Sequence, residues 1–196
     1  MRILLLVAGA LWLCATQALA ADVGVTARKL FIQDFMASQS KAKVKLYSRY
    51  DPGITKGSGL DPADISAQVD IAYVNGATTG TFLMPAGAFW LVNNPRIAMY
   101  VNKAAPIGSS TKVGVIRPVK KLLLSAKSLG ETPIDILGAG DPGPMGVRTV
   151  FTVTNGAETT RHCTLFTTCF YKLYHLDVDA KLKCHTGVPT ACPSAP

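Results

Sequence analysis

The chain has 196 residues, of which 48% are hydrophobic, and 20 basic residues against 12 acidic ones give a formal charge of +8 at pH 7. This length is typical of one domain that is long enough for a real core. The positive balance permits an anionic partner without identifying one.

Residues 1–20 have the three parts of a secretory signal peptide. Arg2 gives a positive start, residues 3–13 are apolar, and Ala18-Leu19-Ala20 is an A-x-A cleavage signature. The apolar run is too short to span a bilayer, and no later stretch approaches that length. We therefore expect a cleaved signal peptide over 1–20 and a secreted or periplasmic product.

Cys14 introduces a lipoprotein alternative, because lipid attachment uses a cysteine near the end of a leader. The residue before such a cysteine is small, and Leu13 is large. Cleavage between Ala20 and Ala21 is therefore preferred, and it leaves residues 21–196 as a single domain with no transmembrane segment.

A polar–apolar alternation of period two predicts β-strands along most of this domain. It is clearest over 41–49, where Lys41, Lys43 and Lys45 face one side, and over 64–74. A segment around 27–36 suits a short helix or a strand. Further strands are predicted at 80–93 (two, around a turn), 96–103, 111–118, 119–128, 147–163, 170–176 and 180–184.

Turn residues separate these segments. Asn155-Gly156 is a strong hairpin signal inside 147–163, and Asp51-Pro52-Gly53 and Asp141-Pro142-Gly143 favour turns. Many short strands at regular spacing predict an all-β domain, an antiparallel β-sandwich of the immunoglobulin-like or jelly-roll-like kind.

Four cysteines remain after export: Cys163, Cys169, Cys184 and Cys192. An even number in an oxidising compartment predicts two disulfides that staple the C-terminal end. Four cysteines allow three connectivities, and the spacing does not choose among them.

A metal or redox site is the alternative, because His162, His175 and His185 lie among these cysteines. The spacings differ from those of zinc sites, and there is no C-x-x-C redox motif. His162 and Cys163 are neighbours, so on a strand they point to opposite faces and cannot share a metal. No metal ligand is therefore predicted.

Other motifs also fail as sites. Residues 138–143 match a G-x-G-x-x-G pattern, but prolines and a strand follow where a helix is needed. Ser58 lies between two glycines without the spacing of a nucleophile elbow. Trp90 is expected in the core. No catalytic residue and no cofactor is predicted.

Lysines form the one remaining candidate site. They are read either as a solvated strand face, where lysine guards an edge against aggregation, or as a weak contact for a polyanion such as an anionic surface glycan, lipid head groups or extracellular nucleic acid. Lys181 and Lys183 form a further group on the final strand. The candidate polyanion contacts are Lys41, Lys43, Lys45, Lys120 and Lys121.

The order KLFIQD, SRYDPGITKG, GTFLMPAGAFWLVN, VGVIRPVKKLLLSAKSLG, RHCTLF and a terminal CP resembles a group of exported bacterial proteins from myxobacterial and environmental genomes. The likeness covers most of residues 21–196, and its motifs are loose. The resemblance implies secretion and no particular reaction. It also implies pairing of Cys163 with Cys192, with Cys169–Cys184 nested inside. Separately, no specific nucleic-acid partner is predicted.

The sequence thus predicts a secreted or periplasmic, non-catalytic β-sandwich that acts as an envelope or extracellular binding module. One alternative is a structural or assembly component of the cell surface that associates through exposed β edges. Another is an enzyme whose site is spread over distant parts of the chain.

Overall fold

The computed structural model describes residues 20–35, 42–57, 61–93, 97–104, 111–127, 129–174 and 178–194, so the predicted signal peptide lies outside it except for Ala20. The strands are β1 (Ala21–Gly24), β2 (Ala27–Phe35), β3 (Lys43–Ser48), β4 (Ile65–Tyr73), β5 (Thr79–Met84), β6 (Trp90–Asn93), β7 (Ile97–Val101), β8 (Thr111–Arg117), β9 (Lys121–Ala126), β10 (Val147–Asn155), β11 (Glu158–Phe166), β12 (Thr168–Tyr174) and β13 (Asp179–Pro189).

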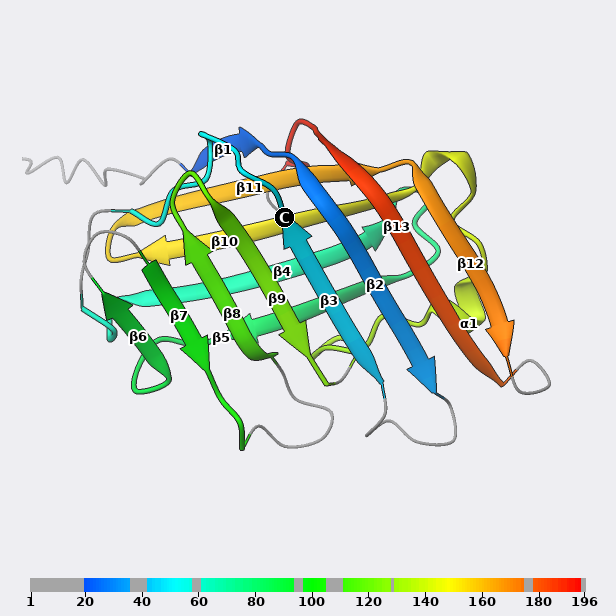
Figure 1. Ribbon diagram of the computed structural model, residues 1–196, viewed down its shortest axis with the longest axis horizontal. Coiled ribbons are helices and arrows are strands. Elements are labelled where there is room, and N and C mark those ends of the chain that lie inside the picture. The colour runs from blue at the N-terminus through cyan, green and yellow to red at the C-terminus, as the bar shows by residue number, and fades with distance from the viewer. Residues whose placement is uncertain are drawn as a thin grey trace, which may run out of the picture.

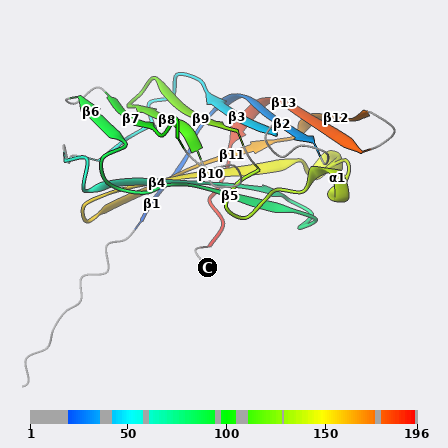
Figure 2. The same cartoon turned by 90° about the horizontal axis from the view of Figure 1, so that it is seen from below.

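These strands form two layers of one continuous sheet. The front layer has the order β12-β13-β2-β3-β9-β8-β7-β6, and the back layer has the order β5-β4-β10-β11. β1 pairs in parallel with β11, and every other described pairing is antiparallel. Figure 1 shows the front strands crossing the back strands obliquely, and Figure 2 shows the two layers stacked.

The layers join where β13 turns a corner. Its first part pairs with β2 and β12, and its end pairs with β11 through Thr164–Pro189 and Leu165–Val188. Thr186 has a φ of 55° at this corner, a left-handed backbone conformation. A Cβ on Gly187 would run into the side chains of Thr164 and Phe166, so glycine permits the close approach.

The fold is therefore antiparallel and almost entirely β, as predicted, but it is a curled half-barrel. Two separate sheets, as in an immunoglobulin-like or jelly-roll-like sandwich, were expected. The physical difference is the corner in β13, which carries one strand from the front layer into the back. At the opposite side β5 and β6 are the last strands of the described sheet, and Thr81 on the edge of β5 forms an isolated antiparallel bridge with Thr132.

The core fills the space between the layers. The alternation over 64–74 is confirmed, because Ile65, Val69 and Ile71 are buried on β4 while the intervening side chains are more exposed. Trp90 is a core residue, 2% exposed, and its indole N–H donates to the carbonyl oxygen of Pro85 at 2.9 Å. Burying each such large apolar side chain contributes about 1.5–3 kcal/mol.

Local predictions hold with small shifts. The segment around 27–36 is a strand, β2, whose alternating side chains enter the core. The hairpin between β10 and β11 turns at Gly156-Ala157, one residue later than predicted, because Asn155 still pairs with Glu158. The short helix α1 (Ile136–Ala139) precedes β10. None of the helices in the described ranges is long and apolar enough to cross a membrane.

Candidate functional site

Two disulfides fix the C-terminal end, and the predicted staples are confirmed. Cys163 on β11 is bonded to Cys192 in the tail, and Cys169 on β12 is bonded to Cys184 directly opposite on β13. These are the pairs that the family resemblance implies. Oxidised cysteines neither bind a metal nor attack a substrate as thiolates, so their role here is structural.

The histidines near these cysteines do not gather. His162 is 1% exposed and faces the core beside Phe151, whereas Cys163 points to the other side of β11. His185 is exposed on the outer side of β13, and His175 lies outside the described residues. In the described ranges no three His, Cys, Asp or Glu side chains are placed to hold a metal ion.

His162 is instead a buried structural link. Its Nε2 accepts a hydrogen bond from the backbone N–H of Thr55 at 3.1 Å, so its Nδ1 carries the proton and donates to the carbonyl oxygen of Phe151 at 3.1 Å. Burial lowers the pKa of this imidazole below its ordinary value. The neutral ring thereby ties the segment after β3 to the back layer.

The same segment is held by Asp51. Burial would raise the pKa of its carboxyl group, but hydrogen bonds from Thr26 and Gly53 to the carboxylate hold that pKa below its ordinary value. These contacts are internal to the fold and leave no reactive group facing solvent.

Basic and aromatic side chains gather on the outer side of the front layer. Cross-strand register places its outward side chains in rows that cross β12, β13, β2, β3, β9, β8, β7 and, in the first row, β6. The first row is Thr168, His185, Lys29, Tyr47, Leu123, Val115, Met99 and Leu91. The second row is Phe170, Lys183, Phe31, Lys45, Ser125, Val113 and Val101.

Basic and aromatic residues alternate over one half of this face, which we call the cationic zone. It belongs to β12, β13, β2, β3 and the start of β9, strands that are far apart in the sequence but adjacent in the sheet. Its members are Arg28, Lys29, Phe31, Lys43, Lys45, Tyr47, Lys121, Phe170, Lys172, Tyr174, Lys181, Lys183 and His185.

Like charges face one another across the strands of this zone. Lys172 on β12 lies directly opposite Lys181 on β13, an arrangement that destabilises a sheet. The ring of Tyr174 lies beneath both ammonium groups, whose Nζ atoms are 4.8 and 5.0 Å from the ring centroid. Such cation–π contacts offset part of the repulsion, and a bound anion would remove more of it.

Aromatic rings support other ammonium groups in the same way. The Nζ atoms of Lys29 and Lys181 both lie 5.8 Å from the ring centroid of Phe31, and that of Lys121 lies 5.9 Å from Tyr47. Several ammonium groups of this zone therefore lie next to the face of an aromatic ring.

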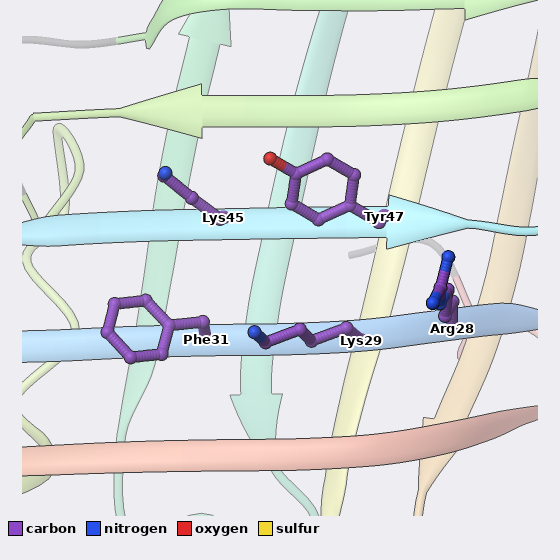
Figure 3. A pocket seen from close by; sticks show the side chains of 5 residues that line it. All are labelled: Arg28, Lys29, Phe31, Lys45 and Tyr47. Atoms are coloured by element: carbon purple, nitrogen blue, oxygen red, sulfur yellow. The ribbon is translucent and has the colours of Figure 1, made fainter.

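A shallow hollow of about 460 Å³ lies in the middle of the cationic zone. It is lined by Arg28, Lys29 and Phe31 from β2 and by Lys45 and Tyr47 from β3. Figure 3 shows these side chains spread over the two neighbouring strands. The hollow brings three cations and two rings together on an open surface.

No exposed carboxylate balances these charges among the described residues of β2, β3, β12 and β13. Asp34 faces inward and is 8% exposed, and burial raises the pKa of its carboxyl group. Asp179, at the first position of β13, is 7% exposed. The outer side of these strands consequently presents positive charge to solvent.

The sequence located part of this zone. Lys43 and Lys45 lie on β3 as predicted, and Lys121 joins them beside Tyr47. Lys120 lies in the turn before β9, not on a strand, and Lys41 and Ser58 are outside the described residues. The residues of β2 and β12 were not assigned to this zone from the sequence, because these strands are distant in sequence from β3. The alternation within each of these strands did indicate that it has an outer face.

No protein-family model matches the chain, and no curated protein and no solved structure matches it either. The resemblance to exported bacterial proteins therefore stays a prediction, and the function is argued from the face itself.

Proposed function

We propose that this protein is an exported, non-catalytic binding module that holds an anionic polymer of the cell surface against its cationic zone. The observation that carries the proposal is the interleaving of cations and aromatic rings on one sheet face, where the described residues of β2, β3, β12 and β13 include no exposed carboxylate. The two disulfides suit an oxidising compartment, which supports export.

The spacing of the cations suits a linear polyanion. Alternate residues on a strand are about 6.7 Å apart, and neighbouring strands are about 4.8 Å apart. Lys43 and Lys45 on one strand and Lys181 and Lys183 on another therefore form a lattice of positive charge around Phe31. A chain with regularly spaced anionic groups can contact several of these cations at once, and each contact adds to the total affinity.

Lys43→Glu combined with Lys45→Glu should abolish salt-resistant retention on immobilised heparin. The change alters the local charge by about four units, and at about 0.5 kcal/mol per unit the loss is about 2 kcal/mol, or roughly thirtyfold in affinity. Both side chains are exposed, so the fold should be retained. The measurement is the dissociation constant for heparin as a function of salt concentration.

Lys103→Glu combined with Arg148→Glu is the matched control, because it makes the same charge change outside the cationic zone. Lys103 follows β7, and Arg148 lies on β10 in the back layer. The control should bind heparin nearly as well as the wild-type protein. If both variants lost the same heparin affinity, the loss would depend only on the net charge of the protein. That result would refute a defined binding face.

A further inference from the structure

The other half of the same face is apolar, and polyanion binding gives no reason for it. This apolar zone lies on the outer side of β6, β7, β8 and β9, where an antiparallel sheet with one solvated face normally carries polar residues. Its members are Leu91, Met99, Val101, Val113, Val115 and Leu123.

None of the six side chains of the apolar zone belongs to the hydrophobic core cluster between the two layers. Gly114 on β8 and Leu124 on β9 point inward. Their neighbours along the strands, Val115 and Leu123, therefore point outward. Val115 and Leu123 are only 8% and 9% exposed, Met99, Val101 and Val113 are half-buried, and Leu91 is 58% exposed. Contiguous apolar side chains on an outer face are typical of a contact surface.

The two zones are continuous. In the first row Leu91, Met99, Val115 and Leu123 lead directly to Tyr47, and then to Lys29 and His185. Phe170, 64% exposed, adds an apolar group at the far end of the cationic zone. A ligand that covers the whole face must therefore offer anionic groups beside hydrocarbon.

We propose that this face docks on the surface of an anionic lipid bilayer, an inference that rests on the cationic zone of the proposed function and extends its ligands from an anionic polymer to a membrane surface. Lipid phosphates would meet the lysines, aromatic rings favour the level of the headgroups, and Leu91 and Phe170 would enter the upper acyl region. Long lysine side chains can reach the phosphates while their methylene stems lie on apolar surface.

The shape of the molecule suits this contact. Figure 1 looks down the shortest axis with the front layer toward the viewer, so this face is one of the two broad sides. Figure 2 shows the front layer extending along the length of the molecule. If a second copy of the chain stacked fully on this face, its cationic zone would meet either the same positive charges or the apolar zone. An anionic bilayer instead offers phosphates to the cationic zone and hydrocarbon to the apolar zone.

Co-sedimentation with lipid vesicles tests the proposal. The wild-type protein should bind vesicles that contain phosphatidylglycerol and should bind vesicles of phosphatidylcholine at least about tenfold more weakly. Leu91→Ser should weaken binding to the anionic vesicles by about tenfold, because transfer of a large, 58% exposed apolar side chain is lost. Heparin affinity of this variant should be unchanged, and its thermal unfolding should match the wild type.

The outcomes separate this inference from the proposed function. Binding to heparin without binding to anionic vesicles would overturn the lipid proposal and leave the polyanion module intact. Equal vesicle binding by the serine variant and the wild type would also overturn it, since the contact would then be purely electrostatic. Binding to neither heparin nor vesicles would refute both proposals.

Discussion

Replacing Cys163 and Cys192 together by alanine should lower the free energy of unfolding by about 3.6 kcal/mol, and replacing Cys169 and Cys184 should lower it by about 3 kcal/mol. The bonds close loops with sequence separations of 29 and 15, and the longer loop removes more entropy from the unfolded chain. At about 2–4 °C per kcal/mol, the midpoint of thermal unfolding should fall by roughly 6–14 °C. Circular dichroism on heating measures both shifts.

Reduced wild-type protein is the matched control, because it loses both cross-links while keeping all four sulfur atoms. Cys163 and Cys184 are fully buried, so their alanine variants also lose some packing, and the reduced protein separates that loss from the loop entropy. A loss below about 1 kcal/mol in both pairs would contradict the role of these disulfides as staples, which is the central structural prediction from the sequence.

Strands were predictable because their signal is local. The lysine alternation of β3 and the apolar alternation of β4 each arise from residues two apart, so burial on one face follows from the sequence. The sheet arrangement was not predictable in this way. The half-barrel depends on the corner at Thr186-Gly187, and its signal is a left-handed backbone at a threonine, which composition does not mark.

The candidate site shows the same limit. Lys43 and Lys45 were found because they share one strand, but the face is completed by Phe31 on β2 and by Lys172 and Tyr174 on β12. These positions become neighbours only through long-range pairing, which a single sequence does not show. The apolar zone was missed because hydrophobic residues on β6 to β9 are indistinguishable in composition from core residues.

Acidification should destabilise the protein through His162. Burial keeps this imidazole neutral in the folded protein, and its pKa there is lower than the ordinary value of 6.5. As the pH falls below 6.5, the unfolded chain binds a proton at this position before the folded one does. The stability that His162 provides is therefore fully present above pH 6.5 and declines as the pH falls toward the folded-state pKa.

His162→Leu should reveal this contribution as a difference from the wild type. At pH 7.5 the variant should be about 2–4 kcal/mol less stable, because the backbone N–H of Thr55 and the carbonyl of Phe151 lose their buried partner. That difference should shrink between pH 6.5 and pH 5, since only the wild type is destabilised there through this residue. Urea unfolding at several pH values measures it.

His185→Gln is the matched control for replacing a histidine, because His185 is exposed on the outer side of β13 and its replacement should leave the stability at pH 7.5 nearly unchanged. Comparing each variant with the wild type at the same pH cancels the titration of all other groups. A His162→Leu difference that stays constant from pH 7.5 to pH 5 would show that the buried ring does not resist protonation.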